Sequence, residues 1–179
     1  VRPGDVVAVV GLGGVGLNAV LGAKLGGAEK IIAIDIADSK LGLARQLGAT
    51  HTFNAKSPDC VAEVMKLTGG GVDFSVETAG AIAAMETCYN ILRTGGQLIA
   101  CGIPGSTEKF EFRPAQLVGE ERGILGSSMG SCVPVRDVPR FISLFQQGRL
   151  PVDRLIDARI GFEEVNEGFD KLARGEVVR

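Results

Sequence analysis

Apolar runs of strand length alternate with segments of helical periodicity along the first two thirds of the chain. The runs predict strands at 5–10, 30–35, 50–54, 72–77 and 97–101, with a possible sixth strand at 121–126. Helical patterns follow the first strand and occupy 39–47, 57–68 and 81–92. Asp38 and Ser57 are expected as helix caps, and Gly95-Gly96 as the turn before the fifth strand. This alternation predicts an α/β fold, a doubly wound parallel sheet with helices on both faces.

The last fifty residues have a different pattern. Amphipathic helices are predicted at 135–147 and 162–174, with a short apolar segment at 155–160 between them. We therefore divide the chain into an α/β domain at 1–130 and a C-terminal tail at 131–179.

A glycine-rich loop directly follows the first predicted strand. In Gly11-Leu12-Gly13-Gly14-Val15-Gly16, the first glycine suits a sharp turn, Gly13 allows close approach of a phosphate, and Gly16 allows the next helix to lie close to the sheet. The N-terminus of that helix presents free N–H groups and a partial positive charge to an anion. Gly14 and Val15 open the helix and are included in the predicted site.

An acidic residue, Asp35, ends the second predicted strand. It lies about 20 residues after the glycine loop, where a carboxylate accepts hydrogen bonds from the adenosine ribose of a dinucleotide. Glycine-rich turns are common, but a strand, this loop, a helix and a second strand ending in an acid together predict a Rossmann-type dinucleotide site.

Composition narrows the classes of partner. The net charge is −2, without the basic excess of a nucleic-acid-binding protein. No apolar run reaches the roughly 18 residues of a membrane span, and no secretory leader opens the chain, so we expect a cytoplasmic protein without membrane contact. Because the chain begins at Val1 without an initiator methionine, we expect it to be a piece of a longer protein.

The metal-binding residue types are few and scattered. The four cysteines, Cys60, Cys88, Cys101 and Cys132, form no CxxC pair, and His51 is the single histidine. The sequence therefore predicts neither a zinc site nor a disulfide framework, and it offers no catalytic residue.

Several motifs together resemble the zinc-type medium-chain alcohol dehydrogenases. They are the glycine loop, Asp35 followed by Lys40, Gly95-Gly96, Cys101-Gly102-Ile103-Pro104, Asn166-Glu167-Gly168-Phe169 and Gly175-Glu176. The resemblance covers the coenzyme-binding domain and the C-terminal tail of that family. It does not include the family's N-terminal catalytic domain.

The resemblance implies NAD as cofactor and a role for each matching residue. In that family the glycine loop holds the pyrophosphate, Asp35 and Lys40 match ribose contacts, and Arg179 matches a phosphate-binding arginine. Backbone groups at positions matching Cys101, Gly102 and Ile103, and Ser127 to Met129, hold the nicotinamide carboxamide. A carboxylate at Asp35 also repels a 2′-phosphate and so favours NAD over NADP.

The resemblance also implies partners and a missing half. The parent enzyme would transfer a hydride between a small alcohol or aldehyde and NAD, with zinc held by the absent catalytic domain and the tail packed toward it. The segment 121–126 matches the edge strand through which members of the family form homodimers. We expect the chain alone to bind NAD without turning over substrate.

Four alternatives stay open. The chain could be the coenzyme domain of a polyol dehydrogenase, or of a quinone-reductase-like medium-chain reductase. A methyltransferase also has glycines after its first strand and an acid after its second, but its ligand has no pyrophosphate. A non-catalytic NAD-binding module is the remaining possibility.

Overall fold

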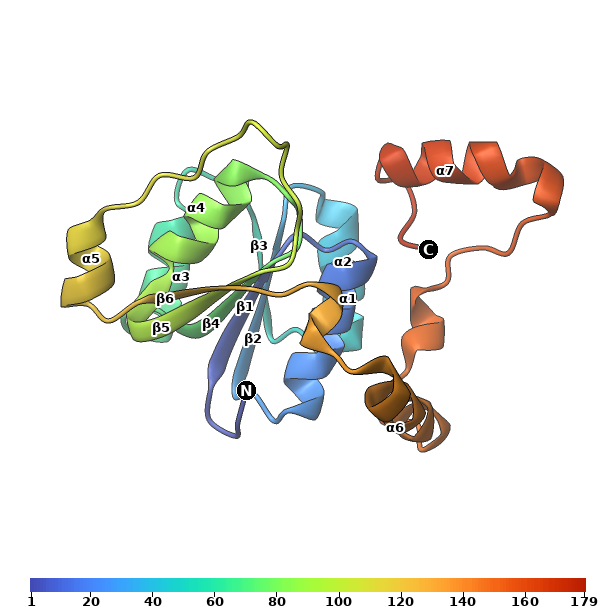
Figure 1. The fold of residues 1–179 in the computed structure, drawn as a ribbon, viewed down its shortest axis with the longest axis horizontal. Helices are drawn as coiled ribbons and strands as arrows, with labels where there is room; N and C mark the ends of the chain where they lie inside the picture. The colour runs from blue at the N-terminus through green and yellow to red at the C-terminus, as the bar shows by residue number, and fades with distance from the viewer.

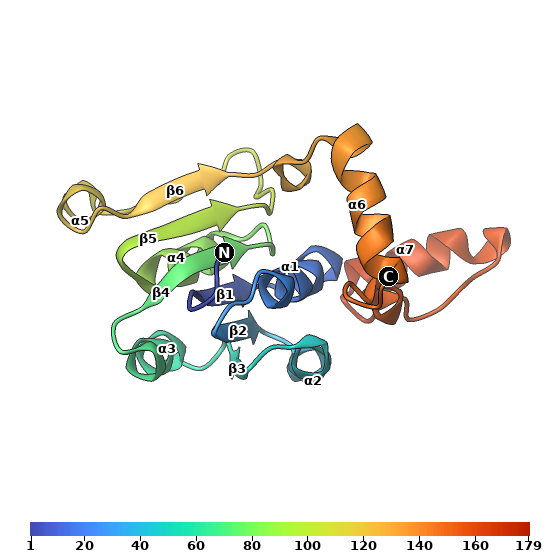
Figure 2. The ribbon, with the colours of Figure 1, turned by 90° about the horizontal axis from the view of Figure 1, so that it is seen from below.

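A computed structural model describes residues 1–179 and shows a six-stranded, all-parallel sheet in the order β3-β2-β1-β4-β5-β6 (Figures 1 and 2). The strands are β1 (Val6–Val10), β2 (Lys30–Asp35), β3 (His51–Asn54), β4 (Val72–Glu77), β5 (Leu92–Ala100) and β6 (Gly123–Gly126). Between them lie α1 (Gly14–Leu25), α2 (Asp38–Leu47), α3 (Cys60–Thr68), α4 (Ile82–Asn90) and α5 (Pro114–Gly119). The predicted doubly wound Rossmann-type sheet is confirmed.

Two apolar cores, one on each face, hold the helices to the sheet. Successive side chains of a strand point to opposite faces, so Val7 and Val9 of β1 pack with α1 and α2, whereas Ala8 and Val10 pack with α3 and α4. Figure 2 shows the two helix pairs on opposite sides of the sheet. Burial of both faces explains why the central strands are almost continuously apolar.

Three features of the secondary structure differ from the sequence prediction. The predicted helix at 81–92 ends at Asn90, because Ile91 and Leu92 are fully buried and β5 already begins at Leu92. The expected turn at Gly95-Gly96 is instead an irregularity within β5, where the register with β4 shifts. The short helix α5 was not predicted.

The predicted helix caps also differ. Asp38 is the first residue of α2 rather than its cap, and its carboxylate accepts a hydrogen bond from Asn54. Helix α3 begins at Cys60, and the Ser57 hydroxyl accepts a long hydrogen bond from the N–H of Asp59.

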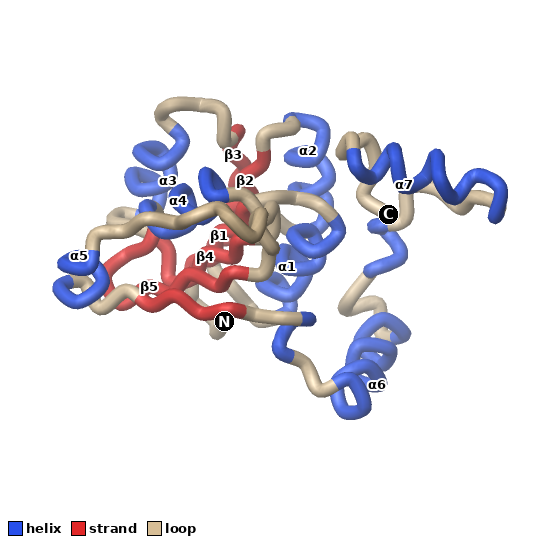
Figure 3. Tube along the Cα trace, turned by 45° about the horizontal axis from the view of Figure 1, so that its top comes forward, coloured by secondary structure: helices blue, strands red, loops and turns tan.

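The tail extends away from the sheet. It contains α6 (Pro134–Gln146), the short helices η2 (Val152–Leu155) and η3 (Phe162–Glu164), and α7 (Val165–Ala173), while η1 (Met129–Ser131) joins it to β6. Figures 1 and 3 show α6 and α7 standing clear of the strands. Leu155 and Val178 return to the core beside α1 and anchor the tail. No helix of the chain has the length and apolar character needed to cross a membrane.

Candidate dinucleotide-binding site

Two glycines of the loop are required by the packing of the turn. Gly11 has φ +92°, and a Cβ placed on it would lie 2.8 Å from the N atom of Ala79. A Cβ on Gly16 would lie 1.8 Å from the carbonyl oxygen of Gly11, so α1 approaches the turn too closely for any other residue. The positive φ of Gly11 agrees with the sharp turn predicted for the first glycine, and the closeness of α1 at Gly16 agrees with the helix packing predicted for the third.

Gly13 leaves the entry to α1 open. No atom lies within 4 Å of a Cβ placed on Gly13, and Gly13 provides no side-chain cap for the helix. The first turn of α1 contains no acidic residue. Its first N–H groups lack partners within the helix, and they lie at the positive end of the helix dipole. The arrangement suits an anion.

Arg179 brings a cation to this helix start. A Cβ on Gly14 would lie 2.6 Å from the Cζ atom of Arg179, so the guanidinium rests directly on the glycine backbone. Asp157 fixes the backbone of Arg179: its carboxylate accepts the Arg179 N–H at 3.1 Å, and its own N–H donates to the Arg179 carbonyl at 3.0 Å. Thus the last residue of the chain and the glycine loop converge, although the sequence separates them by more than 160 residues.

Asp35 sits at the carboxyl end of β2 with 7% of its surface exposed. Its Oδ2 accepts the N–H of Leu12 at 2.6 Å, and its Oδ1 accepts the N–H of Ala37 at 2.8 Å. A carboxylate has about four acceptor positions, so each oxygen can still accept a hydroxyl. The side chain therefore ties the glycine loop to β2 and keeps capacity for a ligand. The bond to the loop was not expected from sequence.

Lys40 approaches the same region from α2. Its Nζ lies 3.5 Å from the position of a Cβ on Gly175, close to the segment that ends in Arg179. The structure thus gathers Lys40, Arg179 and the glycine loop around the carboxyl ends of β1 and β2.

An alanine-rich cavity beside Asp35 was not found by sequence reasoning. It has a volume of about 200 Å³ and is lined by Val10, Gly11, Asp35, Ile36, Ala55, Ala79, Ala81, Ala83, Ala84 and Thr87. Ile36 is 61% exposed there despite following a buried strand. The four alanines within 79–84 were the available signal, since small side chains leave room for a flat group.

The two segments expected to hold the carboxamide lie at the ends of β5 and β6. The N–H groups of Cys101 and Gly102 both donate to the carbonyl of Glu77, and that of Ser127 donates to Ala100, so all three are already paired. Ile103 and Met129 instead extend into solvent, and Met129 has φ +50°. Burial raises the pKa of the Cys101 thiol, so it stays protonated at neutral pH and nucleophilic chemistry there is disfavoured.

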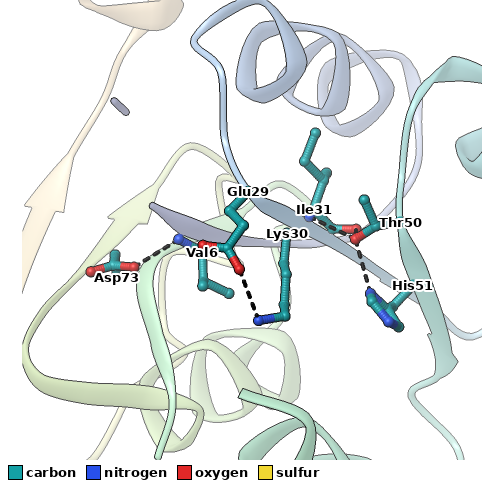
Figure 4. A network of polar contacts seen from close by, with 7 residues as sticks. All are labelled: Val6, Glu29, Lys30, Ile31, Thr50, His51 and Asp73. Carbon is teal, nitrogen blue, oxygen red and sulfur yellow. Dashed lines mark hydrogen bonds and ion pairs between the residues drawn. The ribbon is translucent and has the colours of Figure 1, made fainter. Parts of the chain in front are cut away.

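Neither a metal centre nor a histidine joins the site. No three His, Cys, Asp or Glu side chains converge in a way that could hold a metal ion, so the residues of this chain do not fit a zinc site. His51 lies at the amino end of β3, the end of the sheet opposite the glycine loop, where its Nδ1 lies 2.9 Å from the Thr50 hydroxyl (Figure 4).

Comparison with known proteins gives a consistent result. A family model described as zinc-binding dehydrogenase matches residues 14–147. Alcohol dehydrogenase 1 of Zea mays is 37% identical over 98% of this chain and 47% of its own length. The structure of benzyl alcohol dehydrogenase from Acinetobacter calcoaceticus has a TM-score of 0.96 and 36% identity, covering 99% of this chain and 49% of its own. The structure of 2R,3R-butanediol dehydrogenase from Bacillus subtilis has a TM-score of 0.85 and 28% identity, and the match covers 97% of this chain and 49% of that enzyme.

The chain spans about half the length of the curated relatives that it matches. The matched half contains the glycine loop and Asp35. From the family model, the identity to the plant enzymes and the shared fold, this chain belongs to the zinc-binding dehydrogenase family.

Proposed function

We propose that the chain is the NAD-binding half of an alcohol dehydrogenase that transfers a hydride between an alcohol or aldehyde and NAD. The observation that carries the proposal is the convergence of Arg179, the start of α1 with its open Gly13, and the Asp35 carboxylate at one end of the sheet. Family membership supports the dehydrogenase activity of the longer protein.

Each part of the dinucleotide has a plausible place. The pyrophosphate would lie on Gly13 to Gly16 beneath Arg179, with Lys40 and Asp35 at the adenosine ribose. The alanine-rich cavity would take the adenine, which is flat and largely apolar. The nicotinamide, which accepts the hydride when NAD is bound, would lie against the turns at 101–103 and 127–129, held by main-chain groups. The side chain of Cys101 would then have no chemical part.

Asp35 supports NAD rather than NADP. A 2′-phosphate at the ribose would face a largely buried carboxylate whose oxygens already hold the neighbouring backbone. Repulsion between the two negative groups would oppose NADP binding, because burial weakens solvent screening.

The remainder of the site would come from outside this chain. Hydride transfer needs a polarised carbonyl, and we infer that zinc in another domain of the longer protein supplies this. The apolar faces of α6 and α7 support docking of such a domain on the tail, since Phe141, Phe145 and Phe169 are 43–65% exposed. A cavity of about 270 Å³ between α7 and the C-terminal segment, with Arg179 among its lining residues, belongs to the same surface.

The class of alcohol stays open within the family. One neighbour is a benzyl alcohol dehydrogenase and another a butanediol dehydrogenase, and both share the fold of this half. A polyol dehydrogenase is therefore the second candidate for the longer protein.

Calorimetric titration with NAD and with NADP tests the proposal. We expect NAD to bind at least about tenfold more tightly, because hydrogen bonds to a charged acceptor contribute about 1.5–3 kcal/mol. Asp35→Gly should weaken NAD and strengthen NADP, so that the difference narrows. Asp38→Asn, which removes an exposed acid three residues further on, is the matched control and should change neither. Absence of NAD binding by the folded wild-type chain would refute the proposal.

A further inference from the structure

Glu77, the last residue of β4, is fully buried and has an unusual set of partners. Its Oε1 accepts the N–H groups of Ala79 and Gly80, each at 2.7 Å. Its Oε2 is buried without any hydrogen-bond partner, and no cation pairs with the carboxyl group. Burying a polar atom without a partner is costly, so its retention calls for an explanation.

The backbone of Glu77 adds a second pair of contacts. Its carbonyl oxygen accepts the N–H of Cys101 at 2.9 Å and that of Gly102 at 3.1 Å. One residue therefore binds two turns: the turn at 78–80 after β4 through its side chain, and the turn at 101–103 after β5 through its carbonyl. The main-chain contact would survive any side-chain change, whereas the side-chain contact would not.

The two turns are closely packed against each other. A Cβ on Gly102 would lie 2.2 Å from the N atom of Gly80 and 2.6 Å from Oε2 of Glu77. Gly80, at φ +68°, also lies close to Ile103, because a Cβ there would be 2.9 Å from the Ile103 carbonyl oxygen. The turn at 78–80 also contacts the glycine loop through Ala79 and Gly11. The turn at 78–80 therefore lies between the expected positions of the pyrophosphate and the nicotinamide.

We propose that Glu77 is a positioning residue whose buried carboxyl group fixes the 101–103 turn, through Ala79 and Gly80, at the distance from the glycine loop that the nicotinamide end of NAD requires. It would act through the backbone and touch no ligand. This inference rests on the proposed NAD-binding function. The phosphate and ribose contacts have separate supports, Asp157 for Arg179 and the Leu12 N–H for Asp35. Ala79 is one of ten residues that line the alanine-rich cavity proposed for the adenine, so loss of the Glu77 carboxyl group should weaken the nicotinamide end more than the ADP-ribose end.

The test compares NADH with ADP-ribose, which lacks the nicotinamide, by calorimetry on the 179-residue chain. Glu77→Leu removes the acceptor and leaves two N–H groups unpaired, so NADH affinity should fall about tenfold or more, and ADP-ribose affinity less than about threefold. Glu77→Gln keeps an acceptor oxygen and should stay within about threefold of wild type for both ligands. Ser75→Ala is the matched control, since Ser75 is also fully buried in β4 with an unpaired hydroxyl.

The outcomes separate a positioning role from a structural one. A purely structural role would lower the melting temperature and weaken both ligands equally, or weaken neither, and either result overturns the inference. If Glu77→Leu does not fold, the NADH and ADP-ribose affinities of Glu77→Asp are compared instead. The same difference is expected, because a shorter side chain places the carboxylate about 1.5 Å too far away to accept both N–H groups. If wild type binds neither ligand, the proposed function itself fails, and this is seen before any variant is compared.

Discussion

At the scale of single residues, one glycine of the loop is required for folding and another for ligand binding. Gly16→Ala places a Cβ 1.8 Å from a backbone oxygen and should destabilise the chain by about 2–3 kcal/mol. Gly13→Ala enters open space at an ordinary φ of −77°, so its stability should change by less than about 1 kcal/mol. Its methyl group nevertheless occupies the expected phosphate position, and NADH affinity should fall about tenfold or more. Urea unfolding and NADH titration measure the two effects, and a Gly13→Ala chain with wild-type affinity would contradict the assignment.

Asp73, at the opposite end of the sheet, makes a pH-dependent contribution to the free energy of unfolding. Burial tends to raise the pKa of its carboxyl group, but the Val6 N–H and the Arg93 guanidinium outweigh this and hold the pKa below its ordinary value. Figure 4 shows the contact with Val6. Because the pKa of Asp73 is lower in the folded than in the unfolded chain, the ionised carboxylate stabilises the fold at pH values above its unfolded-state pKa, which is about 4. This stabilisation is lost as the pH falls through the folded-state pKa.

Asp73→Ala tests this contribution. The change should cost about 1–2 kcal/mol at pH 7, after discounting the ion pair because Arg93 is half exposed. Urea unfolding of both proteins at several pH values should show the difference shrinking below about pH 4. A difference independent of pH would contradict the assigned cause.

At the scale of elements, β6 is one of the two edge strands of the sheet, and β3 is the other. β6 pairs only with β5, and Leu125 is 50% exposed on it. Unpaired edges promote pairing with another chain, and we propose a homodimer through 121–126, as the family resemblance implies. Leu125→Lys should therefore shift the chain toward monomer in sedimentation experiments, while Val138→Lys on α6 should not. A wild-type chain that sediments as a monomer at every concentration would contradict the proposed dimer.

Some of these elements can be predicted from the sequence and others cannot. β1, β2 and β4 were placed because buried parallel strands read as unbroken apolar runs. The boundary between α4 and β5 was misplaced because the buried Ile91 and Leu92 follow the helix directly, and the exposed Asn90 is the one polar residue at the transition. α5 was missed because six residues are too few to establish a helical period.

At the scale of the whole molecule, what sequence cannot reveal is convergence between distant segments. The glycine loop and Asp35 belong to one β-α-β unit, so their proximity follows from spacing alone. The contact of Arg179 with Gly14 depends on the path of the tail, which family resemblance implied but periodicity did not. Glu77 gave no signal at all, because an acid ending a strand is ordinary until its burial and its four backbone partners are known.

Amide chemical-shift mapping with NADH tests whether this end of the sheet binds NAD. We expect the largest changes at Gly13 to Gly16, at the residues following Asp35, and at the turns 78–80 and 101–103. Residues of β3 near His51, at the opposite end of the sheet, should not change. If the changes instead gather at the cavity beside α7, or if none occurs at millimolar NADH in a folded sample, the proposed NAD site is wrong.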